Sequence, residues 1–296
     1  MTRRPQDNRD PGSWEWRTLA VASAIYAAFV VLTLNHAALP WWALLLAGGY
    51  VTAWQGSLQH EVVHGHPTPH PLLNELLIFP GLWMWLPFRL YRNSHLSHHA
   101  TPVITDPVDD PESYYLSHEA WSRAGPIRRA FYRFHNTLAG RLTLGPAVSV
   151  YRLMAGEYRR LVSGDYSGLS PWLLHIAGCT LVLGWAVGVC GMGVLEYLAY
   201  FAYPGLSLTL LRSFAEHQAS IDHDERTVIV RSGPLMSLLY LNNNLHAVHH
   251  AEPGLAWYRL PARARSANLP AYAFRGYGEI AARHLFKAKE PVAFPL

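Results

Sequence analysis

The chain has 296 residues, of which 50% are hydrophobic and only 15% are charged, and eleven are tryptophan. This composition is too apolar and too poor in charge for an ordinary soluble protein of this length. The net charge of +4 is unevenly spread, because no lysine or arginine occurs from Thr18 to Phe88 or from Leu161 to Leu211. Segments that cross a bilayer leave such gaps and a basic patch for nucleic acid does not, so we expect membrane lipid and no nucleic acid among the partners.

Four membrane-spanning helices are predicted, since a span needs about 20 mostly apolar residues. Two lie in an uncharged run near the N-terminus, and two flank a Gly-Met-Gly turn further along the chain. The four spans are expected at about 18–36, 40–58, 172–191 and 193–211. Residues 72–88 are apolar but short and contain Pro80-Gly81, so we expect a re-entrant or interfacial segment there and not a fifth span.

The basic residues predict the orientation of these spans, because cytoplasmic loops are enriched in lysine and arginine. The turns near residues 37 and 192 contain none, whereas the N-terminus, residues 89–160 and residues 212–296 contain them all. We therefore expect a multi-pass protein with both termini on the cytoplasmic side of the membrane, which we take to be a bacterial inner membrane.

Residues 127–142 repeat apolar side chains every three or four positions, with arginines on the other faces. This pattern predicts a basic amphipathic helix, either lying on the membrane surface or packed on a soluble core. The basic face around Arg128, Arg129 and Arg133 suits an acidic partner protein or anionic lipid head groups.

Eight of the seventeen histidines occur in three clusters with spacings of three or four, and a ninth, His217, lies just beyond the predicted end of the fourth span. All nine lie near the predicted cytoplasmic ends of the spans. Side chains at these spacings share one face of a helix. The nine candidate metal ligands are His60, His64, His95, His98, His99, His217, His246, His249 and His250. A single zinc takes four ligands, so this number implies two ions. Imidazole suits zinc, copper, iron and nickel alike, so ligand type alone does not identify the metal.

Six polar residues near these histidines are candidates for holding the second nitrogen of a ligating imidazole. They are Glu61, Asp106, Asp109, Asp110, Glu216 and Asn242. The isolated histidines are expected to be structural or exposed, namely His36, His118, His135, His175, His223 and His284. His66 and His70 alternate with prolines and are expected in a loop.

One H-x-x-x-H box and two H-x-x-H-H boxes on four spans resemble the integral-membrane fatty acid desaturases, over about residues 45 to 262. The acidic "DPVDDPESYY", the "NNNLHAVHH" with its trailing "PGLAWYRLP", and "EHQ" at 216–218 are also similar to segments of that family. The resemblance implies two irons, cycling between Fe2+ and Fe3+, that use O2 to remove hydrogen from a fatty acyl chain. It also implies a separate electron carrier, which would be a ferredoxin, a rubredoxin or a cytochrome.

Other functions share parts of this pattern. Carotenoid ketolases and hydroxylases and acyl hydroxylases of the same superfamily have the same boxes. His60-Glu61-x-x-His64 also fits a membrane zinc metalloprotease with Glu61 as base, but that function leaves seven clustered histidines unused. A metal transporter would place its histidines or carboxylates within the spans, whereas the nine clustered histidines lie outside them.

The sequence thus predicts a single desaturase-like domain over residues 1–296. We expect an all-α, multi-pass membrane protein with four transmembrane helices. A helical cap at the cytoplasmic face would hold a histidine-rich site for two metal ions.

Overall fold

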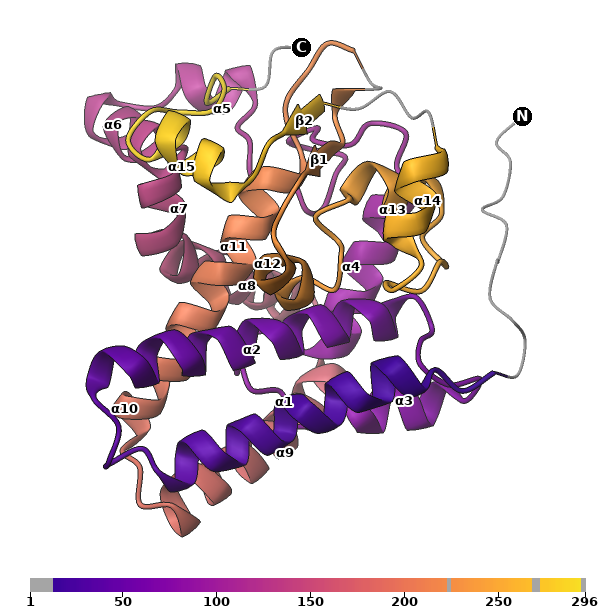
Figure 1. Cartoon of the computed structure of the whole chain (residues 1–296). Coiled ribbons are helices and arrows are strands. Elements are labelled where there is room, and N and C mark those ends of the chain that lie inside the picture. The colour runs from indigo at the N-terminus through magenta and orange to yellow at the C-terminus, as the bar shows by residue number, and fades with distance from the viewer. Residues whose placement is uncertain (1–12, 223–224, 268–271, 294–296) are drawn as a thin grey trace. The chain divides into compact units, whose positions relative to one another are not determined.

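The computed structural model describes residues 13–222, 225–267 and 272–293 (Figure 1). These residues are mostly helical, as predicted. They also include two short strands that were not predicted, β1 (Val228–Val230) and β2 (Tyr272–Phe274), which pair in parallel. His223 lies outside the described residues.

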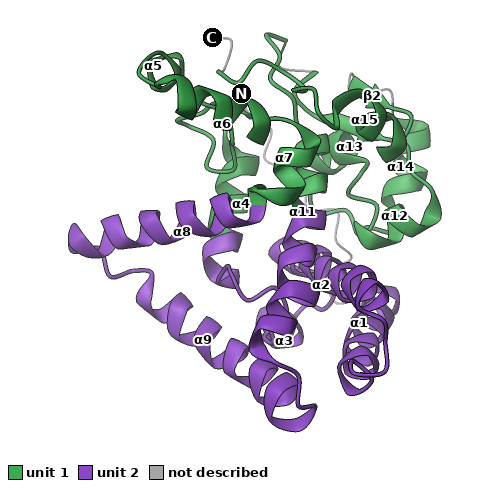
Figure 2. Ribbon diagram, turned by 90° about the vertical axis from the view of Figure 1, so that its left-hand side faces the viewer, with its two compact units in different colours: residues 1–9, 93–145, 210–296 green, residues 10–92, 146–209 purple. Residues whose placement is uncertain are grey.

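The chain divides into two compact units, and each is considered separately here (Figure 2). Unit 1 contains the described residues of 93–145 and 210–296, and unit 2 contains those of 10–92 and 146–209. This division does not test the expected single domain over residues 1–296, which stays a prediction.

Unit 2 contains most of the long apolar helices. Its helices, including two π-helical segments η1 and η2, are α1 (Trp16–Leu34), α2 (Trp41–Val63), α3 (Pro71–Leu77), most of α8 (Gly145–Val162), α9 (Leu169–Leu183), η1 (Gly184–Val189), α10 (Val194–Tyr197) and η2 (Leu198–Ala202). Helices α4 (Phe88–Ala100) and α11 (Tyr203–Glu216) begin in unit 2 and end in unit 1.

Three helices among the described residues are long and apolar enough to cross a membrane. They span Trp16–Leu34, Leu169–Val189 and Val194–Glu216, and they match the first, third and fourth predicted spans. The second predicted span is helical, because α2 runs over 23 residues, but it is not apolar enough to be counted with the other three. The fourth membrane crossing therefore stays a prediction.

Helix α2 is less apolar because protein covers it. From Val51 to Val63 every residue except Trp54 is buried. A Cβ on Gly48 would lie 2.5 Å from the carbonyl oxygen of Tyr200, so the backbone of α2 approaches η2 closely. Small residues allow such close packing between helices in membranes. A helix covered in this way can include polar residues, such as Gln55, that would be costly against lipid.

Residues 72–88 form no spanning helix, in agreement with the prediction that they are not a fifth span. Helix α3 ends at Leu77 and irregular backbone follows, held by hydrogen bonds from within unit 2. Gln55 Nε2 donates to the carbonyl of Pro80 over 2.9 Å, and the Tyr197 hydroxyl donates to the carbonyl of Leu82 over 2.7 Å. These bonds satisfy backbone groups that would otherwise be costly to bury.

Unit 1 consists of short helices around the β1–β2 pair. Its remaining helices are α5 (His118–Ser122), α6 (Pro126–His135), α7 (Leu138–Thr143), α12 (Pro234–Leu239), α13 (His246–Ala251), α14 (Leu260–Ser266) and α15 (Tyr277–His284). Proline stands in the first turn of α6, α12 and α14, where its missing N–H costs nothing. Val228, Val230 and Phe274 of the strands pack with Phe214 of α11 and Ile280 of α15 in the core.

The helix predicted over residues 127–142 is two helices, α6 and α7, and not one. Thr137 ends the run, because its hydroxyl accepts a hydrogen bond from the Gly140 N–H and caps α7. A Cβ on Gly140 would lie 1.9 Å from the carbonyl oxygen of Phe134, so only glycine fits this tight turn. The apolar spacing predicted helical structure over both segments, but as one helix without the break between them.

Candidate metal centre

Seven of the nine candidate ligands belong to unit 1, and they separate into two groups. Group A consists of His95, His99 and His249. Group B consists of His98, His217, His246 and His250. The histidines come from the end of α4, from α13 and from the residue that follows α11.

The ring nitrogens converge within each group. In group A the Nε2 atom of His99 lies 3.1 Å from that of His95 and 3.1 Å from that of His249. In group B all four ligand atoms lie within 4.8 Å of one another. The Nε2 atom of His217 is 2.9 Å from that of His246 and 3.1 Å from that of His98.

The other nitrogen of several rings is held by an acceptor, which determines the tautomer. His98 Nδ1 lies 2.8 Å from Asp110 Oδ1, and His95 Nδ1 lies 3.1 Å from both oxygens of Glu112. In each pair Nδ1 donates its proton and leaves a lone pair on Nε2.

Two further imidazoles in group B are oriented in the same way. His246 Nδ1 donates to Asn243 Oδ1 over 3.1 Å, and His217 Nδ1 donates to the carbonyl of Arg226 over 3.2 Å. Nε2 lone pairs about 3 Å apart repel one another unless a cation or a proton lies between them. The arrangement therefore fits metal ions bound by imidazole, with acceptors that position the ligands.

Burial keeps most of these imidazoles in the form that binds metal. It lowers the pKa of His217, His246 and His250 well below the usual range, and the neighbouring imidazoles lower it further. The pKa of His99 is lowered for the same reasons. A metal ion needs the neutral ring, so these side chains lose no proton on binding it near neutral pH.

His98 differs from its neighbours. Burial lowers its pKa, but the hydrogen bond to Asp110 and the nearby carboxylates outweigh burial and raise it above the usual value. In the same cluster burial would raise the pKa of Glu112, and the surrounding imidazoles, His95 above all, lower it instead. The carboxylates thus bring negative charge to a site that would bind cations.

His60 and His64 belong to unit 2, at the C-terminal end of α2. Their ring centroids are 5.0 Å apart, as expected for residues four apart on one helix. Glu61 is buried beside them, with its Oε1 atom 3.8 Å from His60 Nδ1.

Two of the other predicted positioning residues lie in the histidine cluster of unit 1. Asp110 contacts His98 directly. Glu216 Oε1 lies 3.6 Å from His246 Nδ1, accepts a hydrogen bond from Asn243 and forms an ion pair with Arg212 over 2.8 Å. Glu216 therefore helps to hold Asn243, which contacts the imidazole.

The remaining three have other contacts in the described structure. Asp106 accepts hydrogen bonds from the backbone of Val108 and Asp109 in a turn, and Asp109 is exposed. Asn242 donates to the carbonyl of Trp257 over 3.0 Å. None of the three contacts a histidine nitrogen among the described residues.

Sequence reasoning missed Glu112, Asn243 and the carbonyl of Arg226. Glu112 lies in the acidic stretch that resembles the family, and Asn243 lies three residues before His246, so both had a signal in the sequence. The contact with Arg226 had none, because a backbone carbonyl has no sequence signature. His66, in the predicted loop, has its Nδ1 atom 2.5 Å from Glu15 Oε1. Among the isolated histidines, His36 Nδ1 lies 2.8 Å from Glu196 Oε1, as a structural residue would.

Asp110→Asn is expected to weaken metal binding about 10- to 100-fold, because the amide loses the charge that holds the His98 proton. Competition against a chelator would measure the affinity. Asp109→Asn is the matched control, since it removes the neighbouring charge from an exposed position. Equal losses in the two variants would show that the effect is general electrostatics and not orientation of His98.

A comparison of the sequence with protein-family models agrees with the resemblance that the histidine boxes carry. The family model for fatty acid desaturase matches residues 36–279, a range that contains all nine clustered histidines. No curated protein matches the chain well enough to be counted as a relative. Because the matched range covers more than half of the sequence and contains both histidine groups, this chain belongs to the fatty acid desaturase family.

Proposed function

We propose that this protein introduces a double bond into a fatty acyl chain, with O2 as oxidant and two iron ions held by its nine clustered histidines. Membership of the family makes the protein an oxidoreductase with membrane-spanning helices. The observation that best supports the finer proposal is the division of seven imidazoles of unit 1 into two convergent groups.

Iron is proposed because of the family, since imidazole nitrogens also suit zinc, copper and nickel. Group B offers four imidazoles, whereas group A offers only three within unit 1. We propose that His60 and His64 complete group A, as their box does in the family pattern. Bound iron would supply the power to oxidise an unactivated C–H bond, which no side chain can do.

The chain's own residues would prepare the site for that chemistry. Asp110, Glu112 and Asn243 hold the Nδ1 protons, so that the Nε2 lone pairs point to the metal positions. Burial of His98 and His246 keeps water from competing for those positions.

The proposed reaction needs an external source of electrons. For each double bond the acyl chain loses two hydrogens and dioxygen becomes two molecules of water. The balance requires two further electrons and two protons, so we propose a separate carrier such as a ferredoxin, a rubredoxin or a cytochrome. The acyl substrate would reach the protein from the membrane lipid.

A host with a simple lipid profile that expresses this chain should accumulate a new fatty acid two mass units below its parent, and only when oxygen is present. Mass spectrometry of fatty acids and of supplied carotenoids would measure both products. The purified protein should contain about two irons per chain. Unchanged fatty acids with ring oxygen added to a carotenoid would replace the proposal with a ketolase or hydroxylase, and one zinc without iron would favour the protease.

We also propose that the clustered histidines face the cytoplasm, together with both termini. In a variant with serine at Cys179 and Cys190, single cysteines at Arg92 and Arg259 should both be labelled from the cytoplasmic side only. The reason is that the basic segments around these positions stay on that side during insertion. Labelling of one position only from the opposite side would contradict the proposed topology.

A further inference from the structure

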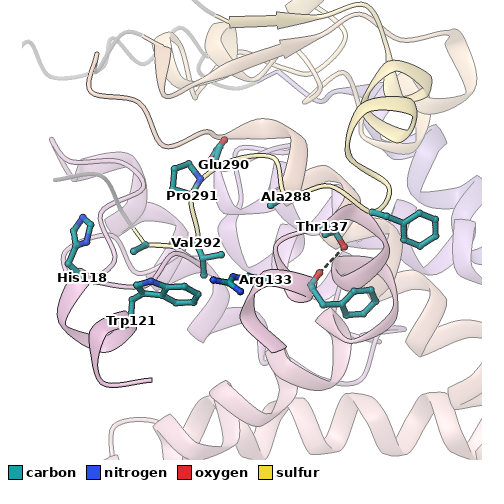
Figure 3. Close-up of a pocket in the computed structure, with 11 residues that line it drawn as sticks. His118, Trp121, Arg133, Thr137, Ala288, Glu290, Pro291 and Val292 are labelled. Atoms are coloured by element: carbon teal, nitrogen blue, oxygen red, sulfur yellow. Dashed lines mark hydrogen bonds between the residues drawn. The ribbon is translucent and has the colours of Figure 1, made fainter. Parts of the chain in front are cut away.

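A large pocket lies in unit 1 outside both histidine groups. Its volume is about 920 Å³. Figure 3 shows Trp121 of α5 and Arg133 of α6 facing Glu290, Pro291 and Val292 of the C-terminal segment across it. Neither the histidine boxes nor the proposed reaction uses this pocket.

The rim of the pocket is basic and its wall is partly apolar. Lys287 is exposed between two lining residues of the C-terminal segment, Phe286 and Ala288, and Arg133 is exposed in the lining itself. Neither of these two side chains forms an ion pair with a carboxylate in the described part of the chain. Phe134 and Phe286, which also line the pocket, are 40% and 78% exposed.

Trp121 lines the pocket and lies beside basic side chains of α6. The guanidinium groups of Arg129 and Arg133 lie 5.4 Å and 5.6 Å from the centre of its ring, within the range of cation–π attraction. Arg129 also donates to the carbonyl of Ser122 over 3.0 Å. Arg129 and Arg133 are thus held against Trp121, so less conformational entropy is lost when a partner binds them.

The wall of the pocket connects to group B through a few buried residues. Glu290 Oε2 accepts hydrogen bonds from the Tyr115 hydroxyl and from the backbone N–H of Ala219, the latter over 2.9 Å. The buried ammonium of Lys289, next to Glu290 in the chain, donates to the carbonyls of Phe214 and His217. His217 belongs to group B, so Lys289 connects the segment that lines the pocket to the backbone of a candidate metal ligand.

We propose that this pocket and its basic rim form the docking surface for a small acidic protein that carries one electron at a time. The inference rests on the proposed function, because the chain needs an electron carrier only if it catalyses the O2-dependent reaction proposed above. Opposite charges speed the encounter of such partners and favour weak, short-lived complexes. The hollow and its connection to His217 favour a protein carrier over the flat surface of an anionic bilayer.

The test uses the full chain, loaded with iron, in nanodiscs of zwitterionic lipid. A plant-type [2Fe–2S] ferredoxin, a rubredoxin and a soluble cytochrome are the probes, and biolayer interferometry measures their dissociation constants. At least one should bind more tightly at an ionic strength of about 0.02 M than at about 0.2 M, since salt screens exposed charges. Arg133→Glu combined with Lys287→Glu should weaken that binding at least about tenfold at low salt.

Two controls make this result specific. Arg265→Glu makes the same type of charge change at an exposed position on α14, at the opposite side of unit 1 from α6 (Figure 2), and should leave the dissociation constant unchanged. Arg133→Lys keeps the charge but loses the planar group over Trp121, so it should weaken binding less than the reversal. Iron content equal to that of the wild type would show that the variants remain folded.

Three outcomes would overturn the docking proposal. None of the probes binds the wild type, or the double reversal leaves the affinity unchanged. Alternatively, in a parallel set of nanodiscs that contain anionic phosphatidylglycerol, the double reversal changes only the dependence of activity on that lipid, which would make the surface a lipid site. Failure of the proposed function looks different, because then the wild type yields no unsaturated product and holds no iron, whatever the binding data show.

Discussion

His250→Ala is expected to remove the iron of group B and to abolish activity. His250 Nε2 lies 3.3 Å from His98 Nε2, and its pKa is lowered by burial and by the surrounding imidazoles, so the ring is neutral and ready to bind a metal. Alanine would leave three imidazoles where the group has four. The iron content measured by metal analysis should fall from about two irons per chain to about one.

His118→Ala is the matched control for this prediction. His118 lies in the same unit but outside both groups, in the lining of the pocket, so its loss should leave the iron content unchanged. Iron content is the relevant measurement here, since a change near the pocket also bears on the carrier. Retention of both irons in His250→Ala would show that group B is not a metal site.

The second large effect is expected at the first histidine box. His60→Ala and His64→Ala should each remove the other iron and abolish activity, because we propose that both rings complete group A. His66→Ala should retain both irons, since the Nδ1 atom of His66 is already bound to Glu15 at 2.5 Å. The three variants change the same residue type within seven positions of one segment, so they control for one another.

The measurement is again iron per chain, with thermal stability as a check on folding. His66→Ala is expected to lose some stability, because a buried histidine–glutamate contact is removed. If His66→Ala lost iron as completely as His64→Ala, the first box would include more of the segment than H-x-x-x-H. If His60→Ala and His64→Ala both kept two irons, group A would be complete within unit 1.

Much of the helical framework follows from the sequence, because local rules determine it. A run of about 20 apolar residues predicted a long helix at each of four places, and each place is helical in the structure. The spacing of His60 and His64 predicted neighbouring rings on one face of a helix, and their centroids are 5.0 Å apart. The family pattern lies in the same local spacing, which is why the boxes were recognisable.

The break between α6 and α7 and the polarity of α2 depend on more distant contacts. Thr137 caps α7 only because the backbone of Phe134 and Gly140 turns there. Helix α2 includes Gln55 because the surrounding chain buries it and supplies the carbonyl of Pro80 as a partner. A hydropathy pattern shows how apolar a helix is, but it does not show which other segments pack against that helix.

The sequence by itself determined which histidines of one helix share a face, and tertiary structure decided that the faces of different helices meet in two groups in unit 1. Successive residues of a helix point about 100° apart, so His98 turns to group B while His95 and His99 turn to group A. Helix α13 divides its histidines in the same way. Likewise Asn243 and not Asn242 holds His246, because the left-handed backbone at Asn242 turns that side chain toward Trp257. Spacing along the chain fixes which rings share a face, whereas only the packing of α4 against α13 and the end of α11 brings one nitrogen to another.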